Sequence, residues 1–599
     1  MGFLVNKAHV EVGLEVPHST TLQIFWAKEG RWYTEGKMTD IFVHPGSKHY
    51  RFILTDLTEI AKLRIDPSRY AGKAKLLYLK IYQGGFQPVE LTGASGLEEL
   101  QPFNQVAELY QDTSGLAFTS LGNDPGLELF LDLTPVDAQW FSPDAAEMFF
   151  LIVITWLLGV ICSSLLIRYR YVLLLLAGAW MLIWVMAVTS KQNSHPDEYV
   201  HLSATTWYQD NWLPPEIESP AIRNTYSVYG YSRLNSWEMY YLLAGKFQKI
   251  MTRLSLNGLQ GLRLINVMFF GTFLVAAVAF PCVRLVALPF LISPQIWYVF
   301  SYCNSDAFGL AVCFLTCCEL VCKGSVFNRF LNSRSVPRLL LSSLYLGCVA
   351  AALLLLKHNY YPFIGVAAVF IMVQRILPAD RQSKCALLYR LAAVVVIGLI
   401  FFGARLGAAY YVNGFDRAEK ISAMHEATAQ PLYSLKTPAA ERMFSMSLKE
   451  RGVSLDTIVD KYNWFQKSFM SSFGVYGYFT VKGSVTYYQI VKAVALFLLL
   501  FLLISVLWRG GTGERLMVLS IILFSCALVF SSLYHSWVVD LQPQGRYLLA
   551  IIPMLALLYA DSHRLVNRTV MSAGVIVLFV LSGYSFIYYG LMQLPGIVS

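Results

Sequence analysis

Two adjacent carboxylates and two histidines lie in one short polar stretch, residues 194–201, with the sequence Ser-His-Pro-Asp-Glu-Tyr-Val-His. The stretch follows an apolar run, residues 171–188, that is long enough to cross a bilayer. A carboxylate at a membrane surface can act as a general base on a hydroxyl that attacks an electrophile. The structural alternative is that an aspartate in the first turn of a helix complements the helix dipole. Asp197 and Glu198 are therefore candidate catalytic residues.

The histidines beside these carboxylates raise the question of a metal. His195, His201 and one aspartate in a short loop are a weak zinc signal. The 10 cysteines show neither zinc spacing nor a disulfide framework, and most lie inside apolar runs. We expect no cofactor; the alternative is Mg²⁺ or Mn²⁺ held by the oxygens of Asp197 and Glu198.

An arginine and a lysine lie where apolar runs meet polar segments. Arg546, within Gln-Pro-Gln-Gly-Arg-Tyr at 542–547, begins a late run, and an arginine in a membrane helix is costly unless it has a partner. Its planar fork can donate two hydrogen bonds to a phosphate, whereas snorkelling to lipid headgroups is the alternative. Lys357 precedes another run, where a lipid-phosphate contact and an interface anchor fit equally well. Both are candidate phosphate ligands.

Several neighbouring polar residues complete the candidate site. Asn304 and Asp306 stand at the predicted start of a helix, where Asp306 can also act as a simple cap. The other candidates are neighbours of the carboxylates and of the two cations, namely His195, His201, Tyr360, Gln544 and Tyr547.

The composition indicates the setting of these residues. The chain has 599 residues, of which 56% are hydrophobic and only 14% charged, and its mean hydropathy is +0.50. These values are typical of a polytopic membrane protein. The net charge of +9 does not indicate a nucleic-acid partner, because the basic residues fall in short loops between apolar runs.

Residues 1–145 are mixed and polar, and they predict a separate domain. Short segments with alternating apolar residues are separated by turn sequences such as Asp-Pro-Ser and Asn-Asp-Pro-Gly. This spacing favours a jelly-roll-like β-sandwich. Such a domain can bind sugar or serve in structure and docking, and Trp26 and Trp32 fit either core packing or stacking on a sugar. The clearest predicted strands are 10–16, 21–27, 49–54, 74–82 and 127–133.

Residues 146–599 form the predicted α-helical membrane domain, with long outer loops at 190–260 and 409–487. Apolar runs of about 20 residues can each span a bilayer. Twelve such runs lie near 147–167, 171–189, 262–281, 283–301, 305–322, 339–356, 360–376, 387–408, 488–508, 515–533, 546–561 and 569–590.

The basic residues of the loops predict the orientation. If the spans alternate, five basic loops fall on one side, which the positive-inside rule assigns to the cytoplasm. The stretch 194–201, Lys357, Arg546 and the N-terminal domain then face the outside. An exported domain needs a signal and none begins at Met1, so we expect a further segment upstream of this start; the alternative is that the spans have the opposite orientation.

These motifs resemble those of a known group of enzymes. The chain is similar to the GT-C superfamily of membrane glycosyltransferases, and within it to a bacterial membrane family that carries a domain of unknown function. The resemblance covers residues 146–595 and the domain ahead of them. One departure is the stretch Glu238-Met239-Tyr240-Tyr241, where relatives tend to have a proline before the tyrosines. The four motifs of that family appear here in order as Pro196-Asp197-Glu198-x-x-His201, Asn304-x-Asp306, Lys357-x-x-Tyr360 and Gln544-Gly545-Arg546-Tyr547.

The resemblance implies an inverting glycosyltransferase at the outer face of the bacterial inner membrane. It would take a sugar from a polyprenyl phosphate, such as undecaprenyl phosphate, and pass it to a periplasmic or cell-surface glycan, for example a lipopolysaccharide. Asp197 would be the general base and Glu198 would position the acceptor or Asp197. Arg546 and Lys357 would hold the phosphate.

Two other functional classes stay open at this point. One is a transporter or flippase for lipid-linked glycans, which would need charges along a path through the membrane. The other is a polymerase or ligase that uses a diphosphate-linked glycan. The ionisable residues gather at helix ends on one predicted side, which favours an enzyme.

Overall fold

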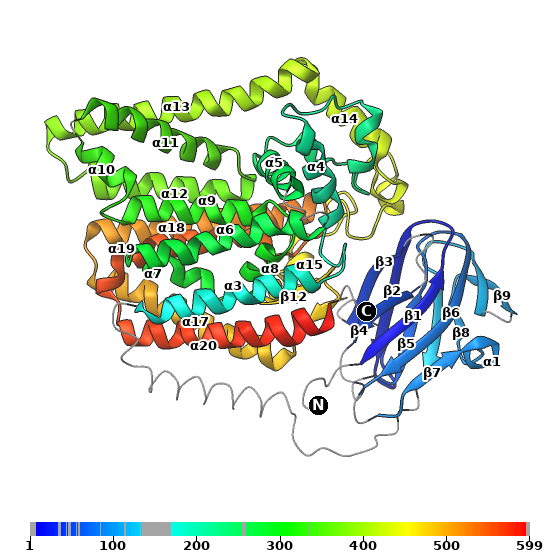
Figure 1. Cartoon of the computed structure of the whole chain (residues 1–599). Helices are drawn as coiled ribbons and strands as arrows, with labels where there is room; N and C mark the ends of the chain where they lie inside the picture. The colour runs from blue at the N-terminus through cyan, green and yellow to red at the C-terminus, as the bar shows by residue number, and fades with distance from the viewer. Residues whose placement is uncertain are drawn as a thin grey trace. The chain divides into compact units, whose positions relative to one another are not determined.

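The computed structural model of the chain is shown in Figure 1. The predicted span 147–167 lies outside the residues that it describes. By their contacts the residues divide into two units. One comprises Met1–Leu151, Val475–Thr486 and Tyr588–Leu594, and the other comprises Ile152–Gly474, Tyr487–Ile587 and Pro595–Ser599. The described residues are 8–33, 37–43, 45, 49–54, 57, 60–83, 86–112, 115–131, 133, 169–253, 259–333 and 335–594.

The N-terminal region is built from two antiparallel sheets, as the alternating sequence pattern predicts. One sheet has the order β4 (His49–Ile53), β1 (His9–Glu15), β6 (Gly72–Tyr82), β10 (Gly115–Ser120) and β9 (Val106–Asp112), and β7 (Val89–Thr92) also pairs with β6. The other has the order β3 (Met38–Val43), β2 (Thr20–Ala27), β5 (Lys62–Asp66), β11 (Gly126–Phe130) and β8 (Gln101–Asn104). A short helix, α1 (Gly93–Leu97), follows β7.

The two sheets share one hydrophobic core. Alternate residues of each strand point to the same face of a sheet, so Val10 and Val12 of β1 are buried together with Leu22 and Ile24 of β2. Trp26 packs partly buried against this core. Trp32 is 81% exposed and therefore does not contribute to it.

The second unit is helical and accounts for the membrane character of the chain. Among the described residues, nine helical segments are long and apolar enough to cross a membrane, or ten if one bent pair counts as a single span. They contain α3 (Tyr171–Thr189), α6 (Leu259–Ala279), α9 (Asp306–Val321), α10 (Val326–Asn332), α11 (Val336–Leu354), α13 (Arg381–Asn413), α17 (Val485–Arg509), α18 (Thr512–Val538), α19 (Ile551–Ser562) and α20 (Arg568–Tyr584). α11 and α13 lie side by side (Figure 1).

Two of the predicted spans differ in form from the rest. The run 283–301 is not one straight helix: α7 (Val283–Ala287) and α8 (Pro294–Ser301) are bent by 100°, with the 3-10 helix η6 (Leu288–Leu291) between them. Two prolines explain the break, because Pro289 and Pro294 cannot donate backbone hydrogen bonds to a continuing helix. The run 360–376 is α12 (Tyr361–Ile371) followed by a π-helical turn, η8 (Met372–Ile376), and it is shorter than the nine.

Short helices and turns lie between the long ones. α4 (Glu198–Asp210) packs on α5 (Tyr240–Arg253) at close range, since a Cβ on Gly245 would meet the backbone of Tyr208 at 2.6 Å. The others are α14 (Arg417–Thr428), α15 (Leu455–Asp460), α16 (Trp464–Ser472), the strands β12 (Val475–Tyr476) and β13 (Val481–Lys482), and the 3-10 turns η4 (Pro220–Thr225), η5 (Arg233–Asn235), η7 (His358–Tyr360), η9 (Pro431–Tyr433), η10 (Ala439–Glu441), η11 (Gly545–Leu548) and η12 (His563–Leu565); α20 continues as the π-helical η13 (Ser585–Leu591).

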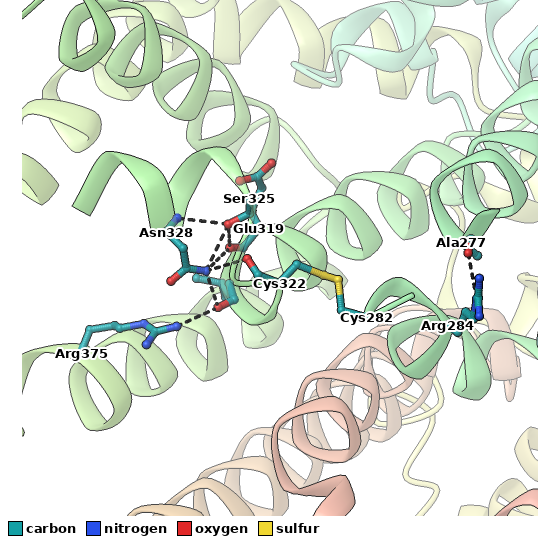
Figure 2. The surroundings of a disulfide bond; sticks show 9 residues. Ala277, Cys282, Arg284, Glu319, Cys322, Ser325, Asn328 and Arg375 are labelled. Atoms are coloured by element: carbon teal, nitrogen blue, oxygen red, sulfur yellow. Dashed lines mark hydrogen bonds between the residues drawn. A yellow bond between two sulfur atoms is a disulfide. The ribbon is translucent and has the colours of Figure 1, made fainter. Parts of the chain in front are cut away.

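One disulfide joins the start of α7 to the end of α9, where the sequence predicted no disulfide framework. Cys282 and Cys322 are 40 residues apart in sequence, and their Cα atoms are 5.8 Å apart. Figure 2 shows the amide of Asn328 beside this bond, where it donates to the carbonyls of Glu319 and Cys322 at the end of α9. Cysteine spacing in apolar runs did not reveal the pair, because a disulfide depends on proximity in space.

Candidate active site

The stretch 194–201 is held by a buried histidine. His195 lies between the Ser190 hydroxyl, 2.8 Å from Nε2, and the Tyr298 hydroxyl, 2.9 Å from Nδ1. Its ring stacks on Tyr302 with the centroids 4.7 Å apart. Burial, followed by the charge of Arg263, lowers the pKa of His195 well below its ordinary value, so the ring is neutral. His195 therefore anchors the loop.

Asp197 precedes α4 in a left-handed backbone conformation, with φ of 58°. Non-glycine residues adopt this region infrequently, and such positions gather at functional sites. The Asp197 side chain makes no capping hydrogen bond to the helix. Its carboxylate is about a third exposed, at 36%, and accepts a hydrogen bond of 2.9 Å from Arg546 Nη2. Capping thus does not explain this side chain.

Glu198, the next residue, is bound in a fully buried ion pair. Its two oxygens accept hydrogen bonds of 2.7 Å each from Nε and Nη2 of Arg263 on α6, and both side chains are 0% exposed. Arg263 also donates to the carbonyls of Ala187 and Ser190 at the end of α3. The pair ties α6, the end of α3 and the start of α4 together. Glu198 is occupied by this anchoring role.

Arg263 was missed by the sequence analysis, although the sequence does carry a signal. It lies within the apolar run of α6, where a buried charge needs a partner. The identity of that partner depends on the fold, since Glu198 is 65 residues away in sequence.

Arg546 reaches Asp197 from the other end of the chain. The two residues are 349 positions apart, and η11 brings Arg546 to the site because Gly545 lies directly against α16. A Cβ on Gly545 would meet the Ser472 hydroxyl oxygen at 2.2 Å, so only glycine fits here. The Arg546 side chain is 8% exposed and stacks over the Tyr547 ring at 5.3 Å, while its Nε is buried without a partner in the described part of the chain.

A second ion pair lies close by. Lys357 Nζ donates to Asp306 Oδ2 at 2.9 Å, at the first turn of α9. Asn304 Oδ1 accepts from the Asp306 N–H at 3.0 Å, and the Tyr360 hydroxyl donates to the Asp306 carbonyl at 3.1 Å. Asn304 and Tyr360 thus hold the turn that carries Asp306. The Asp306 Oδ1 atom is buried, and none of the described residues donates to it.

The charges of three cations act on Asp197. Burial by itself raises the pKa of the Asp197 carboxyl. The charges of Arg546, Arg233 and Lys357 outweigh burial, so this pKa lies below its ordinary value. Asp197 is therefore ionised at neutral pH.

Arg233, in the turn η5, is a site residue that the sequence analysis missed. It is one of several basic residues in the long polar segment 190–260, and nothing in its spacing marks it. Its charge acts on Asp197, Glu238 and Tyr241. Among the residues that the structure describes, its backbone carbonyl accepts from Ser236, whereas its guanidinium makes neither a hydrogen bond nor an ion pair. It is a cation that faces the site with no anion bound to it.

His201 lies one turn along α4 and is also buried. Its Nδ1 is 2.8 Å from the Tyr241 hydroxyl, and the two rings stack. Burial, then the charges of Arg233 and Lys357, lowers the pKa of His201 well below its ordinary value. Within the described ranges no three His, Cys, Asp or Glu side chains are grouped as metal ligands. Both histidines of the stretch are committed to internal hydrogen bonds.

The Gln544–Tyr547 segment continues the network. Gln544 contributes through its backbone carbonyl, which accepts from the Tyr547 N–H at 3.2 Å. The Tyr547 hydroxyl lies 3.5 Å from Arg546 Nη2 and donates to Gln542 Oε1. Gln542 in turn donates to Asp540 Oδ2 at 2.6 Å, which adds a further carboxylate that the sequence analysis missed.

Comparison with known proteins identifies a family of membrane proteins. The family described as "Predicted membrane protein (DUF2142)" matches residues 216–555, more than half of the chain. No curated protein matches.

Proposed function

The chain belongs to this family of predicted membrane proteins, and we propose that it is a GT-C-type glycosyltransferase that uses a polyprenyl-phosphate sugar. The observation that carries the proposal is the Asp197–Arg546 pair. It joins an ionised, partly exposed carboxylate to a guanidinium, with two further cations acting on the same carboxylate. A base beside several cations suits the transfer of a sugar from a phosphate leaving group to a hydroxyl.

In the proposed reaction Asp197 accepts the proton of an acceptor hydroxyl. The hydroxyl oxygen attacks the anomeric carbon as the bond from that carbon to the phosphate oxygen breaks. The sugar is transferred with inversion, and polyprenyl phosphate leaves with one more negative charge. Arg546, Lys357 and Arg233 offset this charge.

The two acidic residues of the stretch have different roles in this proposal. Asp197 reacts, whereas Glu198 fixes the loop through Arg263. In the free protein Arg546 keeps Asp197 ionised. A bound phosphate would share the Arg546 guanidinium, which has an unpartnered Nε, and so would leave Asp197 free to accept the proton.

The phosphate assignment predicts a large effect of Arg546→Lys. Lysine keeps the charge but loses the planar fork, and its shorter reach cannot satisfy Asp197 and a phosphate at once. We expect undecaprenyl phosphate to bind at least about tenfold more weakly, which corresponds to about 1.4 kcal/mol. Binding can be measured with purified protein in lipid nanodiscs.

Arg568→Lys is the matched control, because Arg568 also lies over a tyrosine ring, that of Tyr169, at 4.9 Å. This variant should bind undecaprenyl phosphate like the parent. Parent-like binding by Arg546→Lys would remove Arg546 as a phosphate ligand.

For the location we propose the bacterial inner membrane, with the site, the N-terminal domain and residues 409–487 outside. The basic loops support this orientation. The Cys282–Cys322 disulfide opposes it, because the bond lies at the helix end that precedes the basic residue Lys323, and disulfides are rare in the cytoplasm.

The orientation has a direct test. Single cysteines at exposed positions of the N-terminal domain and of 409–487, in a cysteine-free background, should both react with an impermeant thiol reagent in intact cells. A cysteine near Arg338 should react only after the membrane is permeabilised. Labelling of one outer segment without the other would refute the arrangement.

A further inference from the structure

Asp540 is a buried carboxylate outside the motifs that define the proposed reaction. It lies two residues beyond the end of α18 and is 4% exposed. Backbone hydrogen bonds on either side fix it, from Ser447 N–H to the Val539 carbonyl at 2.9 Å and from Leu541 N–H to the Ser445 carbonyl at 2.8 Å. Its position is therefore set by the main chain.

The two oxygens of Asp540 have different surroundings. Oδ2 accepts two hydrogen bonds, from the Tyr229 hydroxyl at 2.9 Å and from Gln542 Nε2 at 2.6 Å. Oδ1 is buried and has no hydrogen-bond partner among the residues that the structure describes. A buried carboxylate oxygen without a donor is costly, so such atoms in native proteins call for an explanation. One oxygen of this carboxylate thus has an acceptor capacity that the described residues do not use.

Asp540 is connected to Asp197 by hydrogen bonds. From Asp540 the chain runs through Gln542 to the Tyr547 hydroxyl, then to Arg546, which binds Asp197. Tyr229, which donates to Asp540, is sensitive to both carboxylates: burial raises its pKa well above the ordinary value, and the charges of Asp540 and, more weakly, Asp197 add to this effect. Tyr229 thus stays protonated and donates to Asp540.

We infer that Asp540 Oδ1 accepts a hydrogen bond from a hydroxyl group of the donor sugar, an inference that rests on the proposed function. The unpaired atom needs a donor, and a sugar ring presents several hydroxyls. In the proposed function Arg546 binds the phosphate of the donor lipid. The sugar is attached to this phosphate and therefore begins beside Arg546. Asp540 would then be a residue that selects the sugar.

The matched test variant is Asp540→Asn. Because Oδ2 accepts from both Tyr229 and Gln542, the amide oxygen must occupy that position. The amide NH₂ is then forced to the place of Oδ1, where it presents a donor instead of an acceptor. Asp561→Asn is the control, since Asp561 likewise accepts from a glutamine, Gln374 Nε2 at 2.9 Å.

The experiment compares binding of bare undecaprenyl phosphate with binding of undecaprenyl phosphate carrying glucose, galactose or mannose. The parent should bind at least one sugar-bearing lipid more tightly than the bare lipid. In Asp540→Asn this gain should fall about tenfold or more, as expected for a hydrogen bond to a charged group, while bare-lipid affinity stays unchanged. Asp561→Asn should keep the gain.

A second measurement uses the parent and does not depend on how the variant folds. The preferred sugar is tested in monodeoxy forms, each of which lacks one hydroxyl. For the parent, removal of one particular hydroxyl should abolish the gain in affinity over the bare lipid. For Asp540→Asn, removal of the same hydroxyl should have no further effect. The inference would be overturned if Asp540→Asn kept the gain in affinity for the sugar-bearing lipid. It would also be overturned if the parent bound none of the three sugar-bearing lipids more tightly than the bare lipid. A parent that binds neither kind of lipid would instead overturn the proposed function, and this inference with it.

Discussion

Replacing Asp197 by asparagine is expected to abolish detectable sugar transfer while the protein still folds and binds the donor. Asparagine has nearly the same shape but cannot accept the proton of the acceptor hydroxyl. A general base contributes about 10²–10⁴ in rate, so the loss should be of that size. The assay is transfer from a polyprenyl-phosphate sugar to a candidate glycan by purified protein in lipid.

The pH dependence adds a check on the same residue. Since nearby cations hold the pKa of Asp197 below its ordinary value, the carboxylate stays ionised as the pH falls from 7 to 5. Transfer by the parent should therefore not decline through protonation of Asp197 in this range.

A helix-capping role for Asp197 predicts a different result. Asparagine caps helices about as well as aspartate, so a cap would make Asp197→Asn almost silent. Asp210→Asn on the same helix, α4, is the control, because Asp210 is exposed and pairs with Lys249. Near-normal turnover by Asp197→Asn would exclude it as the base and remove the main residue-level support for an enzyme.

The fold was predictable where the sequence pattern is local. Alternating residues such as Val10 and Val12 indicate which face of a strand is buried, and the two sheets follow. The apolar runs likewise predicted most of the long helices. The bend within 283–301 was harder to predict, because Pro289 and Pro294 lie inside a run whose average hydropathy is that of a span.

Site residues could be predicted only where their type is unusual for their position in the sequence. Asp197, Lys357 and Arg546 stand out as charges next to apolar runs, and the structure brings them together. Arg233 carries no such mark, since it lies in a polar segment where a charge is ordinary. Asp540 does follow an apolar run, but the sequence does not show that it is buried or which residues it contacts. Their importance depends on neighbours from other parts of the chain.

Glu198 shows that two residues adjacent in sequence can have different roles in the structure. Asp197 and Glu198 form one acidic pair in the sequence, yet only Glu198 is within the helix, while Asp197 precedes it with φ of 58°. Their side chains therefore diverge, one to Arg546 and the other to Arg263. Local sequence does not reveal this divergence, because it follows from the backbone turn that ends the loop.

The buried pair leads to the second large expected effect: Arg263→Met should strongly destabilise the protein. It leaves the Glu198 carboxylate buried with no counter-ion, and breaking a buried pair in this way typically costs about 3–5 kcal/mol. Unfolding of the purified protein in detergent, followed by heat or denaturant, measures the loss. Arg338→Met on α11 is the control, since Arg338 is exposed.

The double variant Glu198→Leu/Arg263→Met separates folding from positioning. Replacing both partners removes the uncompensated charge, so much of the lost stability should return. The hydrogen bonds from Arg263 to the end of α3 remain absent, however, and these fix the loop that carries Asp197. We expect a double variant that folds and binds undecaprenyl phosphate but transfers sugar with a lower kcat. Parent-like stability of Arg263→Met would show that the pair is not the anchor, and full kcat in the double variant would show that Asp197 does not depend on it.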